Sequence, residues 1–363
     1  MTDRTRRSVL AGIVGAAAGA ALAGCDDKKK ETPASETPKT GPETPLTPSK
    51  PSTPDKTYKI AWSVWTGWMP FKLMQEKGLL AKRASEHGVK IELVEFKGYM
   101  DSVQAFAAKK VDGVTMTSME SLQPASNGVD SVAILVNDIS NGGDGVLVRS
   151  NMKLEDLKGQ TVLLEEFSVS HYLLVRALES VKMAEKDVKI KNIPGDDAGK
   201  AFLTDQSVKA VTTWNPHLFQ ATEQGKGKVV FSSKDVPGEI IDFLVVSGAA
   251  LQENPNLGKA LVEAWYDAMD MIKDGKTRSE AIEIMAKGAG ATVEEFNKML
   301  ADTDLFTDRT KCQQFLGSDT LKDTMAKIKK FSFDHGLIKD AGFDIGFGPG
   351  AQKLRFDAKY VIK

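Results

Sequence analysis

Cysteine is almost absent from this chain of 363 residues, which has only Cys25 and Cys312. Two cysteines cannot supply a disulfide framework or a thiolate metal cluster. A surplus of positive charge is also missing, because 48 Lys and Arg stand against 49 Asp and Glu and the net charge is -1. A chain with this balance has no broad basic surface for a phosphate backbone, so nucleic acid is not an expected partner.

Motifs for catalysis and metal binding are missing as well. The four histidines are scattered, and no His-Glu or Cys-Cys spacing typical of a metal site occurs. There is no Gly-x-Gly-x-x-Gly, no phosphate-binding loop and no Gly-x-Ser-x-Gly. The sequence therefore predicts a protein that is not an enzyme and uses no cofactor or metal.

Long hydrophobic runs are confined to the N-terminus, since no later run approaches the ~20 residues that span a bilayer. Arg6 and Arg7 precede a small, apolar run at 9–23, which predicts a signal peptide over residues 1–24 and is compatible with twin-arginine export. The run ends Leu22-Ala23-Gly24-Cys25, which resembles a bacterial lipobox. Lipidation of Cys25 is therefore predicted, with ordinary peptidase cleavage as the alternative.

The next segment has little that could fold. Residues 26–56 carry seven of the fourteen prolines and no aromatic or β-branched apolar residue. Each X-Pro step favours extended polyproline II, so residues 25–56 are predicted to form a disordered tether behind the lipidated cysteine.

From Thr57 onward, short β-rich runs alternate with amphipathic helices, which predicts an α/β fold with mostly parallel sheets. One series has strands at 58–62, 89–96 and 114–117 and helices at 70–83 and 100–110, the first with Phe71, Met74 and Leu79 inward. A second series has strands at 145–149, 161–164, 188–192 and 208–213 and a helix at 169–181. Crossings are expected at Gly142-Gly143 and at 240–246. This predicts lobe one over 57–140, lobe two over 141–240, and a return crossing with a helical part over 241–363.

Several motifs carry a family resemblance. Glu76-Lys77-Gly78-Leu79, Lys110-Val111-Asp112-Gly113, Asp156-Leu157-Lys158-Gly159 and residues 168–174 resemble the solute-binding proteins of ABC importers in the nitrate/sulfonate/taurine class, over residues 57–275. The stretches 62–70, 168–174 and 212–216 resemble the subgroup near urea carboxylase systems. The resemblance implies a two-lobed type II periplasmic-binding-protein fold with a hinge, whose lobes close on a small solute.

Tryptophan is concentrated where a ligand would sit. Trp62, Trp65 and Trp68 fall within seven residues at the end of the first strand. Trp62 keeps the inward phase of the strand and is equally compatible with the core, whereas Trp65 and Trp68 are predicted to be cleft walls. Trp214 ends a second-lobe strand and is predicted to face them, while Trp265, in a helical pattern, is assigned to the core. Such rings suit a flat or cationic ligand.

Charged groups stand beside the expected start of the 169–181 helix. Either Ser168 or Ser170 could cap that helix, and a helix start favours an anion. Glu165 and Glu166 precede it, however. If strand side chains alternate, one of the two points to the cleft, and Glu166 is assigned to it because it lies beside the helix start. The alternative for Glu166 is a solvated surface carboxylate.

Six further polar candidates lie at predicted strand ends, crossings or the helix start. They are Tyr99, Ser118, Glu120, Asp144, His171 and Asp242. For each, a structural role as a cap, turn or packing residue stays open.

Together these features predict a monomeric lipoprotein on the periplasmic or extracytoplasmic face of the cell membrane. It would deliver a small nitrogenous solute such as guanidine, urea or an amide to the permease and ATPase subunits of an ABC importer. The alternative ligand is an organosulfonate, taurine, nitrate or another small anion. A pyrimidine-precursor (thiamine-related) binding protein or enzyme, and a lipid-anchored sensor, are further alternatives.

Overall fold

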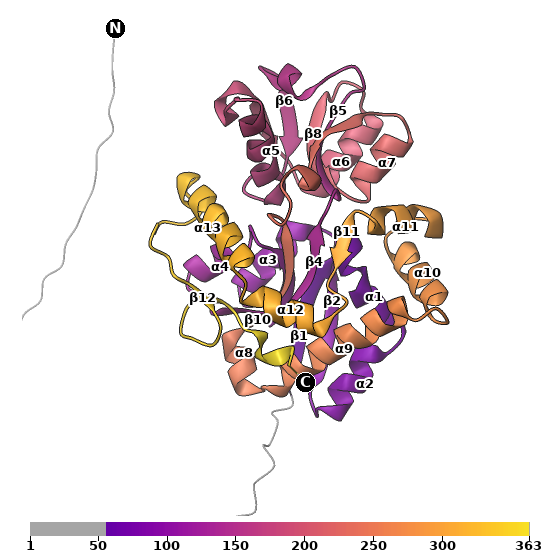
Figure 1. Ribbon diagram of the computed structural model, residues 1–363, viewed down its shortest axis with the longest axis vertical. Coiled ribbons are helices and arrows are strands. Elements are labelled where there is room, and N and C mark those ends of the chain that lie inside the picture. The colour runs from indigo at the N-terminus through magenta and orange to yellow at the C-terminus, as the bar shows by residue number, and fades with distance from the viewer. Residues whose placement is uncertain (1–55, 363) are drawn as a thin grey trace, which may run out of the picture. The chain divides into compact units, whose positions relative to one another are not determined.

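The computed structural model describes residues 56–362 (Figure 1). The predicted signal peptide, the lipidation site at Cys25 and all but the last residue of the predicted tether lie outside this range. None of the described helices is long and apolar enough to cross a bilayer.

The first sheet organises what we call lobe one. Its strands run in the order β12 (Ile345–Phe347), β13 (Leu354–Phe356), β4 (Ser131–Ser140), β10 (Ile241–Ser247), β3 (Gly113–Thr117), β1 (Thr57–Ser63) and β2 (Lys90–Phe96), and β11 (Thr303–Leu305) pairs with β4. Around it lie α1 (Met69–Glu76), α2 (Leu79–Glu86), α3 (Tyr99–Ala107), α4 (Leu122–Ser126), α8 (Gly248–Glu253), α9 (Asn256–Lys273), α10 (Arg278–Gly288), α11 (Val293–Leu300), α12 (Arg309–Leu316) and α13 (Asp319–Asp334) (Figure 1).

The second sheet organises lobe two. Its order is β7 (Lys189–Asn192), β6 (Thr161–Leu164), β8 (Ala210–Trp214), β5 (Asp144–Val148) and β9 (Lys228–Ser232). Figure 1 shows α5 (Val169–Ser180) on one side of these strands and α6 (Gly195–Thr204) and α7 (His217–Glu223) on the other. Short 3-10 turns complete the chain at η1 (Thr66–Trp68), η2 (Leu154–Leu157), η3 (Glu185–Asp187), η4 (Ser233–Asp235) and η5 (Ala358–Tyr360).

Both sheets are mixed rather than mostly parallel. β10 runs antiparallel to β3 and β4, and β5 runs antiparallel to β8 and β9. The reason is the connectivity, because β5 and β10 are the strands on which the chain enters lobe two and returns to lobe one. The crossings are the short segments 141–143 and 236–240. The extended run predicted as the second crossing is β10 itself, which lies inside the first sheet.

The helix predicted at 70–83 is divided into α1 and α2. Gly78 adopts φ +65°, in the left-handed region that ends a helix, and α2 starts immediately after it. The break shifts the helical phase, so that Leu80, rather than Leu79, becomes the buried leucine. Phe71 and Met74 are buried as predicted.

The long helix α9 anchors the core beneath these two helices. Trp265 is fully buried in it, and its ring lies 5.3 Å from that of Phe71 in α1. Helices α1, α2 and α10 all pack on α9. Helix α1 also contacts η1, the 3-10 turn that contains Trp68.

Candidate functional site

A cavity lies where the two lobes meet, at the carboxyl ends of β1, β3 and β8 and the amino ends of β5 and β10. It is narrow, and the centre of a water-sized sphere can reach only about 20 Å³ of it. Both lobes and the crossings line it, with Ser63, Val64, Trp65, Trp68, Tyr99, Thr117, Asp144, Val169, Trp214, Ile240 and Asp242. None of these described lining residues has a positively charged side chain.

Four aromatic rings form the walls. The ring centroids of Trp68 and Tyr99 are 5.4 Å apart, and Trp214 meets Tyr99 edge-on at 6.1 Å. Trp65 follows β1 and is also buried. Trp214 stands directly against the backbone of Gly195, where an added Cβ would come within 2.1 Å of the ring. Rings from both lobes therefore face one small space.

Buried carboxyl groups share this space. Asp144 and Asp242 are 5% and 2% exposed, and both line the cavity. Burial raises the pKa of Asp144 to about 7, and burial together with the charge of Asp138 raises that of Asp242 well above its ordinary range. Asp138, fully buried in β4, accepts a hydrogen bond from Trp65 Nε1 at 3.1 Å.

Glu120 connects the two lobes beside the cavity. Its Oε1 accepts a hydrogen bond from the backbone N of Val169, the first residue of α5, at 2.7 Å. Its other oxygen is hydrogen-bonded to the hydroxyl of Thr117, whose backbone N donates to Tyr99 Oη at 3.0 Å. A side chain of lobe one, Glu120, thus already accepts the hydrogen bond that the first amide of the lobe-two helix can donate.

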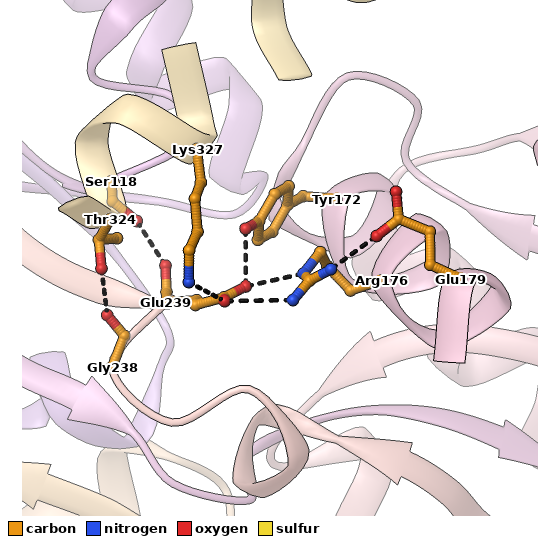
Figure 2. A network of polar contacts seen from close by, with 8 residues as sticks. All are labelled: Ser118, Tyr172, Arg176, Glu179, Gly238, Glu239, Thr324 and Lys327. Atoms are coloured by element: carbon orange, nitrogen blue, oxygen red, sulfur yellow. Dashed lines mark hydrogen bonds and ion pairs between the residues drawn. The ribbon is translucent and has the colours of Figure 1, made fainter. Parts of the chain in front are cut away.

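A second polar network holds the return crossing (Figure 2). Glu239, in segment 236–240, accepts hydrogen bonds from Tyr172 Oη at 2.7 Å, Arg176 Nε at 2.9 Å and Lys327 Nζ at 2.7 Å. Burial raises the pKa of Glu239, but these three donors outweigh it, and the net shift is downward. Because Tyr172 and Arg176 belong to α5 and Lys327 to α13, Glu239 ties lobe two to the C-terminal helix of lobe one.

One group of described residues has ligand types suited to a metal ion. Atoms of His171, Glu185 and His335 lie within 4.8 Å of one another. The backbone N of Phe167 donates to His171 Nδ1 at 3.2 Å, which assigns the proton of a neutral imidazole to Nε2, 3.4 Å from Glu185 Oε1. That nitrogen then has no lone pair for a metal. The geometry fits a polar contact between lobe two and α13 better than a metal centre.

Comparison with known proteins identifies the family. Residues 52–286 match the model of the NMT1-like family. This chain belongs to the NMT1-like family. It is also 24% identical over 259 residues to a protein assigned as an aliphatic sulfonates-binding protein in Bacillus subtilis (strain 168), which covers 68% of this chain and 75% of that protein.

Solved structures share the fold of this NMT1-like protein. The alkanesulfonate-binding protein SsuA from Xanthomonas axonopodis pv. citri, bound to MOPS, superposes with a TM-score of 0.66 at 17% identity over 78% of this chain and 95% of that one. The periplasmic nitrate-binding protein NrtA from Synechocystis PCC 6803 gives 0.58 at 14% identity over 76% and 85%. The predicted two-lobed periplasmic-binding-protein fold is confirmed, and the nitrate/sulfonate/taurine class is supported. The urea carboxylase subgroup stays a prediction.

Of the predicted site residues, six line the cavity. They are Trp65, Trp68, Tyr99, Asp144, Trp214 and Asp242. Glu120 is buried beside them and bonds to Val169, a lining residue.

Besides Glu120, four further predicted residues lie outside the lining. Ser118 Oγ donates to the carbonyl of Glu239 at 3.1 Å and so fastens β3 to the return crossing. Ser168 caps α5, where its Oγ accepts from Ser170 N at 3.2 Å. His171 faces Glu185 and α13, and burial lowers its pKa.

Glu166 is the fourth, and the choice between the two adjacent glutamates is corrected. Glu165, not Glu166, turns toward the acidic groups: its Oε2 accepts from Gly195 N at 3.2 Å, and burial with the charge of Glu120 raises its pKa to about 7. β6 ends at Leu164, and the chain then turns through Glu166 and Phe167, so strand alternation does not extend to this position.

Sequence reasoning missed Asp138 and Glu239. Asp138 lies in a buried strand that offers no local motif, and its importance comes from pairing with Asp242 across β4 and β10. The one available signal is an acidic residue inside the hydrophobic run 132–139, which is unusual in a buried strand.

Proposed function

We propose that this NMT1-like protein is the solute-binding component of an ABC importer and that it captures a small, flat cation of the guanidinium type outside the cytoplasm. Neutral urea and amides would use the same groups more weakly. The observation that carries the proposal is the cavity itself, in which two buried carboxyl groups and four aromatic rings meet and no described lining side chain is positive.

Charge and shape both favour a cation. A cation over an aromatic face gains about 0.5 to 2 kcal/mol, and a charge-assisted hydrogen bond contributes about 1.5 to 3 kcal/mol. Guanidinium is planar and can donate paired N–H groups to a carboxylate such as Asp144 while its faces lie against Trp65, Trp68 or Trp214. Opposing rings also exclude water, which strengthens these contacts.

A small anion is the second candidate. It is favoured by the sulfonates and nitrate named for the similar proteins, and by Val169, which brings the positive end of α5 to the cavity. A helix start offers only about half a unit of charge. An anion must also displace Glu120 from the Val169 amide and approach Asp144 and Asp242, which disfavours it.

Calorimetric titration with guanidinium, urea, acetamide, taurine, an alkanesulfonate and nitrate tests the proposal. The buffer must contain no sulfonate, because a similar protein was crystallised with MOPS. We expect guanidinium to bind, Asp144→Asn to weaken it about tenfold or more, and Glu166→Gln, outside the cavity, to have a small effect. Tight taurine or nitrate binding that survives Asp144→Asn would promote the anion. Recovery of the bound solute unchanged would separate a carrier from an enzyme.

The importer role also implies partners and a location. We expect the chain to deliver its solute to permease and ATPase subunits, and the lipobox at Cys25 to hold it on the outer face of the membrane. A pull-down from solubilised membranes that recovers no permease would instead support a sensor role.

A further inference from the structure

Asp138 and Asp242 form a buried pair of carboxyl groups. Asp242 lines the cavity, and Asp138 lies behind it. They are register partners of the antiparallel strands β4 and β10 and are 0% and 2% exposed. Register partners of antiparallel strands project from the same face of a sheet, so the two carboxyl groups are neighbours. Asp138 Oδ2 and Asp242 Oδ1 are buried and have no hydrogen-bond partner among the described residues. Since two ionised carboxylates repel in a buried site, the pair holds one proton.

The groups around the pair do not neutralise it. Trp65 Nε1 donates to Asp138 Oδ1, and the titratable side chains that act on the pair include Asp144, Glu120, Tyr99 and, at the surface, Asp304, none of them basic. The basic side chains near the crossings pair elsewhere. Arg176 and Lys327 bind Glu239, and Lys234 binds Asp302 at 2.7 Å.

We propose that Asp138 sets the charge that this site accepts: the Asp138–Asp242 pair releases its proton to solvent when a monocation enters the cavity and keeps it when the solute is neutral. This rests on the proposed function. In the first case one O–H bond breaks, the proton leaves to water, and the pair gains one negative charge that the bound cation balances. In the second case the retained O–H can donate to a carbonyl oxygen. Asp138 does not line the cavity, so it is a positioning residue that acts through Asp242.

The two solute classes then have opposite dependence on pH. Cation binding coupled to release of one proton strengthens by up to about tenfold for each pH unit while the free pair stays protonated. Binding of a neutral solute gains nothing from rising pH. A single cavity can therefore discriminate guanidinium from urea by the protonation of the Asp138–Asp242 pair, of which only Asp242 lines the cavity.

The test is calorimetry of the full protein with guanidinium chloride, near pH 7, in phosphate and in tricine, two buffers with different ionisation enthalpies. Sulfonates and buffers with a net positive charge are avoided because they are candidate solutes, and tricine is a zwitterion without net charge near pH 7. We expect the observed enthalpy to differ between the buffers by about one proton's ionisation. Asp138→Asn, which keeps an acceptor for Trp65 and a donor for Asp242, should remove about one proton from this count and flatten the pH dependence of affinity. Asp323→Asn, at an exposed position of α13, is the matched control.

The possible outcomes distinguish failure of this inference from failure of the proposed function. Equal enthalpies in the two buffers, with guanidinium bound, would overturn the inference and leave the proposed function standing. An unchanged proton count in Asp138→Asn would assign the proton to another group. Binding of taurine but of no cation would overturn the proposed function itself. If Asp138→Asn fails to fold, the buffer comparison repeated in Asp144→Asn still decides, because a proton that Asp144 releases in the wild type is absent from that variant.

Discussion

Asp144 illustrates the energetic cost of placing a carboxyl group in a cavity without a cation. Burial raises its pKa from 3.8 to about 7, a hydrogen bond with Ser140 opposes this, and the charge of Glu120 adds to it. Between these two pH values the folded protein holds a proton that the unfolded chain has released. The stability contributed by this group is therefore complete below about pH 4 and is lost as the pH rises through about 7.

Asp144→Asn should change this pH dependence. Asparagine stays neutral, so we expect the variant to gain stability relative to the wild type by roughly 2 to 4 kcal/mol between about pH 5 and pH 8. Thermal unfolding of the ligand-free proteins at a series of pH values measures it, with Asp323→Asn as the control. A stability difference that is constant over this range would mean that Asp144 is ionised in the folded state.

Residue patterns predicted the aromatic part of the site better than its acidic part. Trp65, Trp68 and Trp214 were identifiable because each stands where a strand ends and a loop begins. Asp138 was not, since its partner Asp242 lies more than a hundred residues away and only the sheet register joins them. The sequence could not decide whether Glu165 or Glu166 points toward the site, because that depends on how the backbone turns after β6.

At the scale of elements, local periodicity predicted most strands and helices but not their directions. The strand at 161–164 and the start of the helix at Val169 agree with the structure, because the strand run and the cap at Ser168 are local signals. The antiparallel course of β5 and β10 is a consequence of connectivity, which residue patterns do not contain. Gly78 ended α1 where the hydrophobic pattern continued.

The contact between α5, α13 and the return crossing depends on Glu239. Its side chain is 6% exposed, and removing its charge leaves Arg176 and Lys327 without their shared acceptor. We expect Glu239→Gln to lower stability by about 1 to 3 kcal/mol. Glu179→Gln, at an exposed partner of Arg176, should cost less than about 0.5 kcal/mol.

Heat is the appropriate denaturant for this pair of variants, because urea and guanidinium are themselves candidate solutes. Equal melting temperatures for the two variants would show that Glu239 contributes no more than a surface ion pair.

At the scale of the whole molecule, lobe closure should be visible in tryptophan emission. Trp65, Trp68 and Trp214 line the cavity from both lobes, whereas Trp265 is buried in the core of lobe one. Solute binding should shift the emission of the wild type and of Trp265→Phe, and the shift should shrink in Trp214→Phe. Flat emission during a titration in which calorimetry detects binding would contradict a closure that involves these rings.

Membrane attachment is predicted to depend on Cys25, which lies outside the described residues. Cys25→Ala should move the protein from the membrane fraction to the soluble fraction, or leave an uncleaved precursor. Affinity for guanidinium should not change. The distribution is followed by fractionation and immunoblotting, and an unchanged membrane fraction in Cys25→Ala would argue against lipidation.

The bond from Val169 N to Glu120 makes the protein its own competitor for anions. A tethered group acts as though it were present at millimolar or higher effective concentration. The affinity for a free anion that binds the same amide is therefore lowered by a constant factor, whatever other contacts the anion makes. A cation does not compete with Glu120 for this amide, and the negative charge of Glu120 attracts the cation to the cavity. Glu120→Ala removes both the charge and the acceptor that holds the Val169 amide, and would thus shift the selectivity of this protein toward anions.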